Sequence, residues 1–207
     1  MKPQALQFST PDDREELARA EVYGLLAHLF VAAPGEALYE QLRVAPTEAP
    51  AAGGFLEGPW GEVVATARRL PRETVVAEYD ALFQAIGKPE IFLYGSFHLA
   101  GAINDKPLVE LRDDLRSLGL ERGEGVTETE DHIASLCEVM RFLIAGDDVE
   151  ICSLEQQRRF FRIHLQTWVE ALCAAIEAHP RADFFRAVAG FMGAFVQVEA
   201  QGFDLID

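Results

Sequence analysis

The sequence predicts an all-α protein, a multi-helix bundle of roughly seven to nine helices. Two observations indicate this class. Apolar residues recur at the i, i+3, i+4, i+7 spacing that places them on one face of a helix. Alternating strand patterns are scarce, and 49% of the 207 residues are hydrophobic, which is enough to build a buried core.

The N-terminal helix is the clearest element of the first half. Ser9, Thr10 and Pro11 suit a helix start, and Pro34 followed by Gly35 suits its end. The residues expected on its inner face are Val22, Leu25, Leu26, Leu29 and Phe30. Residues 45–61 are rich in Ala, Gly and Pro and predict a loop with a short helix on either side.

The middle of the chain is predicted to alternate helices with loops. Pro71 is expected to start a helix. The residues on the inner side of that helix are Val75, Tyr79, Leu82, Phe83 and Ile86. Residues 88–101 have no helical period and predict a packed loop, whereas residues 107–119 predict a short helix.

Residues 120–131 have the composition of a linker, with two glycines and few large apolar side chains. We therefore expect an N-terminal helical lobe at residues 1–119 and a hinge at residues 120–130. A C-terminal helical lobe at residues 131–207 would share a core with the first lobe.

The C-terminal part is predicted to be helical throughout. Its first helix carries a regular apolar stripe of Ile133, Leu136, Cys137, Met140, Leu143 and Ile144. Two long helices at residues 153–178 and 181–201 are expected to follow. The last one is apolar on more than one face, as is typical of a central helix.

The charge and cysteine content narrow the class of partner. The net charge is −16, from 18 basic and 34 acidic residues. Such a surface repels nucleic acids and anionic lipids and attracts cationic partners, although it also suits plain solubility.

Cys137, Cys152 and Cys173 lack the spacing of a zinc or disulfide framework. With neither a secretory-signal pattern nor an apolar run of ~20 residues, we expect a cytoplasmic protein.

The sequence contains no catalytic or cofactor motif that we can identify. Glycine-rich phosphate loops, HExxH, Glu-x-x-His and GxSxG are all missing. Asp131 followed by His132 has the reverse order of the His-Asp pair in metal-dependent phosphohydrolases. We therefore predict no enzyme activity, no resident cofactor and no metal site.

Carboxylates crowd the start of the helix that carries the stripe. Seven acids stand between residues 113 and 131, against two arginines. Acids at a helix start are stabilised by the macrodipole, by ~0.3–1 kcal/mol each, but a histidine there is not. If Thr129 caps the helix, its geometry places Asp131 and His132 away from the stripe, on the rim of the fold. Such a cluster can accept guanidinium groups in bidentate geometry.

Four short motifs occur in order along the chain. Residues 128–132, Glu-Thr-Glu-Asp-His, resemble the Glu-Pro-Glu-Asp-His signature of the TorD/DmsD/NarJ family of cytoplasmic molybdoenzyme chaperones. Residues 79–83 resemble its aromatic-x-x-Leu-Phe helix and residues 94–97 its aromatic-x-Ser loop. Residues 164–168 resemble its His-Leu-x-x-Trp. Thr129 departs from the usual proline.

The resemblance implies a TorD-like fold and a non-enzymatic chaperone. Such a protein binds the twin-arginine signal peptide of a molybdoenzyme catalytic subunit, delays export and assists insertion of the molybdenum cofactor. The expected signal-peptide-binding residues are Glu128, Glu130, Asp131, His132, Tyr79, Leu82, Phe83, Tyr94 and Ser96. The acids would meet the arginines. The aromatic and leucine side chains, partly exposed in a groove, would meet the apolar segment; plain core packing is the alternative explanation for Tyr79, Leu82 and Phe83.

Three alternatives stay open. The first is a NarJ-like assembly chaperone for a subunit that is not exported. The second is a small helical hydrolase or nucleotide-binding protein, since some relatives are thought to bind GTP weakly. The third is a purely structural helical module. The resemblance allows a monomer or a domain-swapped dimer, and it does not name the client.

Overall fold

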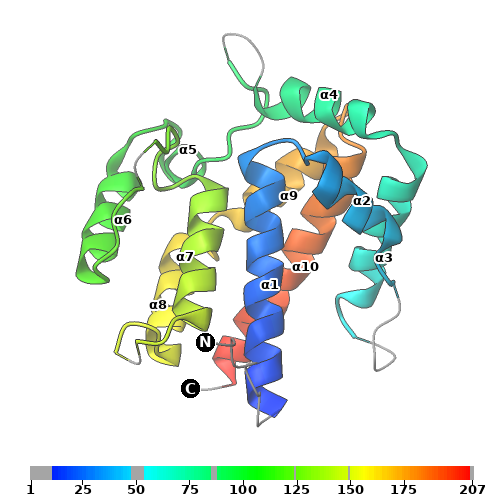
Figure 1. Cartoon of the computed structure of the whole chain (residues 1–207). Coiled ribbons are helices and arrows are strands. Elements are labelled where there is room, and N and C mark those ends of the chain that lie inside the picture. The colour runs from blue at the N-terminus through cyan, green and yellow to red at the C-terminus, as the bar shows by residue number, and fades with distance from the viewer. Residues whose placement is uncertain (1–10, 48–53, 85–87, 124, 149, 206–207) are drawn as a thin grey trace.

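The computed structural model describes residues 11–47, 54–84, 88–123, 125–148 and 150–205. These residues form ten α-helices and no strand (Figure 1). The helices are α1 Pro11–Val31, α2 Glu36–Val44, α3 Glu57–Arg69, α4 Arg72–Phe83, α5 Gly95–Ala100, α6 Lys106–Ser117, α7 Ile133–Ala145, α8 Leu154–His164, α9 Val169–Ala178 and α10 Phe184–Asp204. The all-α prediction is confirmed, and the number of helices is close to the expected one.

Helix α1 lies at the centre of the fold, packed along α7 (Figure 1). It also contacts α10, where the rings of Tyr23 and Phe195 meet edge to face with centroids 4.8 Å apart. Beside them the buried carboxylate of Glu199 accepts hydrogen bonds from both Arg19 and the hydroxyl of Tyr23. Because a buried carboxylate is costly without partners, this contact fixes α1 against α10.

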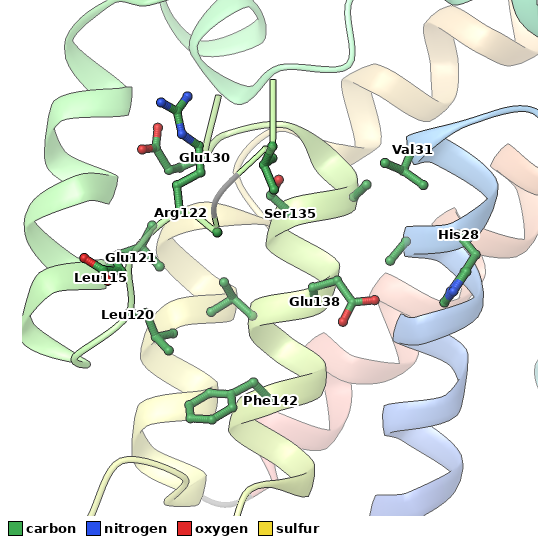
Figure 2. A pocket seen from close by; sticks show the side chains of 15 residues that line it. His28, Val31, Leu115, Leu120, Glu121, Arg122, Glu130, Ser135, Glu138 and Phe142 are labelled. Atoms are coloured by element: carbon green, nitrogen blue, oxygen red, sulfur yellow. The ribbon is translucent and has the colours of Figure 1, made fainter. Parts of the chain in front are cut away.

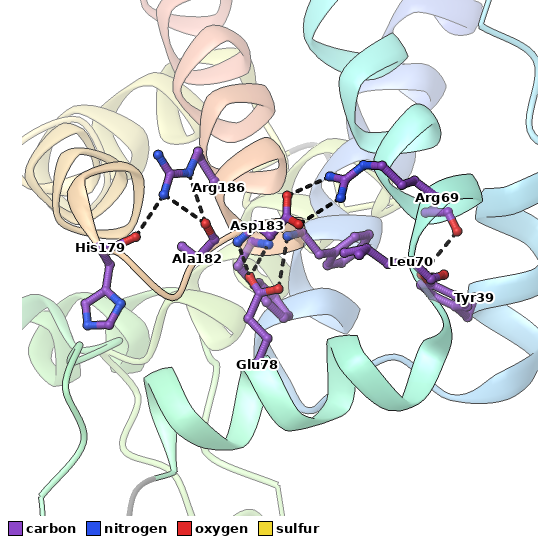
Figure 3. A network of polar contacts seen from close by, with 11 residues as sticks. Tyr39, Arg69, Leu70, Glu78, His179, Ala182, Asp183 and Arg186 are labelled. Carbon is purple, nitrogen blue, oxygen red and sulfur yellow. Dashed lines mark hydrogen bonds and ion pairs between the residues drawn. The ribbon is translucent and has the colours of Figure 1, made fainter.

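Helix α4 crosses the end of the bundle where α1 ends and α10 begins (Figure 1). The carboxylate of Glu78 accepts the backbone N–H groups of Asp183, Phe184 and Phe185 at 2.8–3.0 Å (Figure 3). Asp183 makes no cap of its own, since its carboxylate is paired with Arg69. Glu78 therefore satisfies the first amides of α10 from a neighbouring helix.

The motif residues of α4 belong to the core. Tyr79, Leu82 and Phe83 are only 3%, 0% and 8% exposed. Tyr79 and Phe83 pack against Phe185, with ring centroids 5.6 and 5.1 Å away, and the hydroxyl of Tyr79 donates to the carbonyl of Phe30. The expectation that these three side chains are partly exposed in a groove is wrong, because α1 and α10 both cover this helix.

Several helix boundaries differ from the predicted ones. The expected helix at residues 153–178 is two helices, α8 and α9, separated by Leu165–Trp168, where the indole N–H of Trp168 donates to the carbonyl of His164 at 2.6 Å. Part of the expected loop at residues 88–101 is helix α5. Helix α3 begins inside the expected loop at residues 45–61, since Pro59 is tolerated in a first turn. The predicted cap at Ser9 and Thr10 and the predicted core residue Ile86 lie outside the described residues.

The segment between α6 and α7 is irregular over its described residues. The hydrophobic core extends from Ala20 to Phe203 and includes helices on both sides of this segment. A hinge at residues 120–130 stays a prediction. Among the described residues, no helix combines the length and the apolar character that crossing a membrane requires.

Candidate functional site

Two of the motifs meet in space, although they are far apart in the sequence. Tyr94 and His132 form an isolated antiparallel bridge. The N–H of Gly95 donates to the carbonyl of Asp131 at 2.9 Å, and the N–H of Ile133 donates to the carbonyl of Leu93 at 2.8 Å. The aromatic-x-Ser loop and the acidic motif are therefore held together as one structural unit.

Asp131 is a buried structural residue, with 3% of its surface exposed. Its carboxylate accepts the backbone N–H of Ser96 at 2.8 Å and the hydroxyl of Thr129 at 2.6 Å. The expectation that it lies on the rim is wrong. The helical geometry behind that expectation does not apply, because α7 begins at Ile133 and Asp131 precedes it.

His132 is the N-cap of α7 and not its third residue. Its Nδ1 accepts the N–H of Ala134 at 3.2 Å, and its ring lies edge to face with Tyr94 at 5.1 Å. The side chain is buried, with 4% exposed, so the expected rim position is wrong here too. Burial lowers the pKa of His132, against the opposing charges of Glu128 and Asp131. A neutral imidazole is also what a ring nitrogen needs in order to accept a hydrogen bond.

Ser96 and Tyr94 support the same unit from α5 and the residue before it. Ser96 is fully buried, and its hydroxyl oxygen has no hydrogen-bond partner among the described residues. It borders a cavity of about 20 Å³ together with Asp131, His164 and Trp168, so the fourth motif also converges here. The hydroxyl of Tyr94 donates to Glu128, and burial, this hydrogen bond and the charge of Glu128 raise the pKa of Tyr94.

Glu130 is the motif residue that reaches a large open groove. The groove has a volume of about 490 Å³ and lies between α1, α7, the end of α6, residues 120–123 and Val126 (Figure 2). Its apolar lining consists of Ala27, Val31, Leu115, Leu120, Val126, Ala134, Val139 and Phe142. Glu121, Glu130 and Glu138 also line the groove, together with Arg122. This surface can hold an apolar segment that also carries cations.

Two other hollows of similar size also combine apolar side chains with glutamates, but they differ in lacking a motif residue. Hollows of about 520 and 550 Å³ lie beside the N-terminal part of α1, and no motif residue lines either of them. Among the described residues, no cluster of three or more His, Cys, Asp or Glu could hold a metal ion. The groove beside Glu130 is therefore the candidate site.

The apolar part of this site was missed by the sequence prediction. Val139 and Phe142 lie outside the buried stripe of α7, and Phe142 is 40% exposed. The sequence did contain a signal for it: Val139 and Phe142 give α7 a second apolar face beside the stripe that is already buried. Of the predicted site residues, Tyr94, Glu128 and Glu130 are partly accessible, and the others are buried.

Comparison with known proteins agrees with this arrangement of motifs. Residues 50–174, more than half of the chain, match the family described as "Nitrate reductase delta subunit". The "Chaperone protein TorD" of Photobacterium profundum is 25% identical over 134 residues, which cover 61% of this chain and 62% of that protein. The protein of the same name from Vibrio cholerae serotype O1 is 26% identical over 137 residues, or 63% and 62%.

The chain thus spans about 62% of the length of the curated relatives that it matches. Both relatives are named as chaperones. The motif order, the helical fold and the family match agree, and the chain belongs to the nitrate reductase delta subunit family, the TorD/DmsD/NarJ family that its motifs resemble.

Proposed function

We propose that the protein is a non-enzymatic chaperone for the maturation of a molybdoenzyme, and that it binds the twin-arginine signal peptide of the catalytic subunit. The names of the relatives support the chaperone role. Family resemblance supports the further steps, which are delayed export and assisted insertion of the molybdenum cofactor in the cytoplasm.

One observation carries the proposal for the binding site. Glu130, an acid of the family-like motif, lies in the wall of the apolar groove. A twin-arginine peptide has two guanidinium groups followed by an apolar segment. Carboxylates pair with guanidinium groups in bidentate geometry, and the exposed side chains of Val31, Val126 and Phe142 can cover the apolar segment.

The predicted site residues take two roles in this proposal. Glu130 contacts the peptide, and Glu128 adds negative charge beside it. Asp131, His132, Tyr94 and Ser96 act indirectly, because they hold the segment that carries both acids. The buried α4 residues, Tyr79, Leu82 and Phe83, stabilise the core and make no contact with the peptide.

Titration calorimetry with a twin-arginine leader peptide, beside a Lys-Lys version and at two salt concentrations, tests the proposal. We expect the arginine form to bind more tightly and to weaken as salt rises. Equal binding of both forms would mean that the apolar segment alone is recognised. No binding of either form would contradict the proposal.

Two pairs of variants test the location of the site. Glu130→Gln should weaken binding of the twin-arginine leader about tenfold, since a charged hydrogen bond contributes ~1.5–3 kcal/mol. Glu110→Gln, which removes an exposed acid of α6, is its control. Phe142→Ser should weaken binding as well, with Phe55→Ser as control, because Phe55 is 80% exposed and does not line the groove.

A NarJ-like role, in which the client is not exported, is the second candidate. A leader that lacks the arginine pair but keeps an amphipathic apolar face would then bind as tightly as the twin-arginine leader. The same groove would bind such a leader, since its apolar side chains outnumber its acids.

Sedimentation of the complex would also distinguish a monomer from a domain-swapped dimer.

A further inference from the structure

The carboxylate of Glu130 is already occupied by an arginine of the same chain. Nε of Arg112, on α6, donates to Oε2 of Glu130 at 2.9 Å, and Nη2 of Arg112 lies 2.8 Å from the same oxygen in an ion pair. A second arginine, Arg122, lines the groove and extends its side chain toward Glu130 (Figure 2). Two guanidinium groups of the chain itself therefore lie around this acid.

The two partners of the ion pair differ in how firmly they are held. The side chain of Glu130 is 15% exposed, whereas that of Arg112 is 41% exposed. Burial works against the charge of Glu130, but Arg112, a backbone hydrogen bond and the charge of Arg122 outweigh it and lower the pKa of the carboxyl. The acid is thus mostly enclosed by the fold, while the side chain of the arginine paired with it is accessible to solvent.

We propose that Arg112 is an internal competitor at the groove, which occupies the guanidinium position of Glu130 until an arginine of a bound peptide displaces it. The inference rests on the proposed function, since it assumes that the groove binds arginine-containing leaders. Displacement replaces one guanidinium–carboxylate pair by another, so Glu130 is paired with a cation in both the free and the bound protein. The contact lowers affinity without changing the chemistry of recognition.

Arg112→Gln is the variant that tests this competition. Removing an ion pair of this partly exposed kind should raise the affinity for the twin-arginine leader about two- to fivefold. Binding should also become more salt-sensitive, because the peptide then forms an ion pair that replaces none. Arg116→Gln is the matched control. Arg116 lies on the same helix and is paired with exposed Asp113, so this variant removes the same charge but leaves the ion pair of Glu130 in place.

A double-mutant cycle with Glu130→Gln separates competition from a structural effect of residue 112. Once Glu130 is neutral, Arg112→Gln should change the affinity no more than Arg116→Gln does. Urea unfolding of each variant establishes that the compared proteins are folded. A gain in affinity that persists in the Glu130→Gln background would overturn the proposal.

The outcomes also distinguish this inference from the proposed function. If the wild type binds the leader and Arg112→Gln binds it equally or more weakly, the competitor role is wrong and the chaperone role stands. If neither protein binds any leader while both are folded, the proposed function itself fails, and the inference fails with it.

Discussion

His132 shows at the scale of one residue how the motif combines structure with charge. Asn, Asp and Ser are the favoured N-cap residues, and a histidine fills this role only while its accepting nitrogen is unprotonated. In the folded protein, burial keeps His132 neutral by lowering its pKa. In the unfolded chain the same group takes up a proton near its ordinary pKa of 6.5. The motif residue is therefore a titrating cap.

His132→Asn should reduce the pH dependence of stability between pH 7 and pH 5. Below about pH 6.5 the unfolded state binds more protons than the folded state, so wild-type stability falls as the pH falls. Asparagine caps the helix without titrating. The free energy of unfolding of the variant should therefore change less steeply with pH, by up to about 1.4 kcal/mol per pH unit. His98 and His164, whose pKa values burial also lowers, keep part of the slope.

Urea unfolding of the wild type and of His132→Asn, at several pH values in this range, measures how the free energy of unfolding of each protein depends on pH. Loss of the imidazole from its contact with Tyr94 shifts the free energy of unfolding by the same amount at every pH, so only the slope reports titration. Parallel pH curves for wild type and variant would mean that His132 does not titrate on unfolding.

At the scale of the elements, two glycines mark contacts of very different stiffness. A Cβ at Gly24 on α1 would lie 3.1 Å from Cδ of Arg141, a half-exposed side chain of α7. A Cβ at Gly95 on α5 would lie 3.1 Å from the indole of Trp168, which is 2% exposed. That indole is also held by its hydrogen bond to the carbonyl of His164. The first neighbour can move away and the second cannot.

Gly24→Ala and Gly95→Ala should therefore change stability in opposite directions. The first should raise the free energy of unfolding by ~0.5–1 kcal/mol, since alanine is the better residue in a helix interior. The second should lower it by ~1–3 kcal/mol, the usual cost of overpacking. Denaturant unfolding of both variants provides the comparison, and each serves as the control of the other. Equal effects would show that the contact with Trp168 yields as easily as the one with Arg141.

The elements also show what could be predicted from the sequence. The apolar stripe of α7 could be predicted, because a helix is the structure that brings six apolar residues at this spacing onto one face. All six residues are buried. The inner side of α4 could be predicted too, since Tyr79 and Phe83 are buried as that pattern indicates. That neither side chain opens into a groove could not, since it depends on α10 packing against α4. The bridge between Tyr94 and His132 is a tertiary contact that local periodicity does not reveal. The acids of the motif stand out in the sequence as a group, but only the start of α7 decides which of them are buried.

At the scale of the whole molecule, the core connects the two halves of the chain through both tryptophans. The rings of Trp60 on α3 and Phe191 on α10 lie 5.4 Å apart. Trp168, between α8 and α9, stacks on His98 of α5 at 5.3 Å. Each tryptophan thus contacts residues on the other side of the segment at residues 120–130.

Unfolding of the two halves should coincide. In Trp60→Phe the fluorescence reports Trp168, and in Trp168→Phe it reports Trp60. In each variant the fluorescence midpoint in urea should equal the midpoint from far-UV circular dichroism of the same variant, as in a two-state transition. Separate midpoints would instead support two lobes that unfold independently around a hinge.

The packing of α1 along α7 has a consequence for the synthesis of the protein. Helix α1 ends at Val31, whereas α7 begins at Ile133 and ends at Ala145. At ~5–20 residues per second, the ribosome adds the intervening chain in on the order of ten seconds. Throughout that time the apolar face of the nascent α1, with Leu26 and Phe30, has no α7 to pack against. A member of a chaperone family is thus itself, while it is being made, a chain with an unprotected hydrophobic helix.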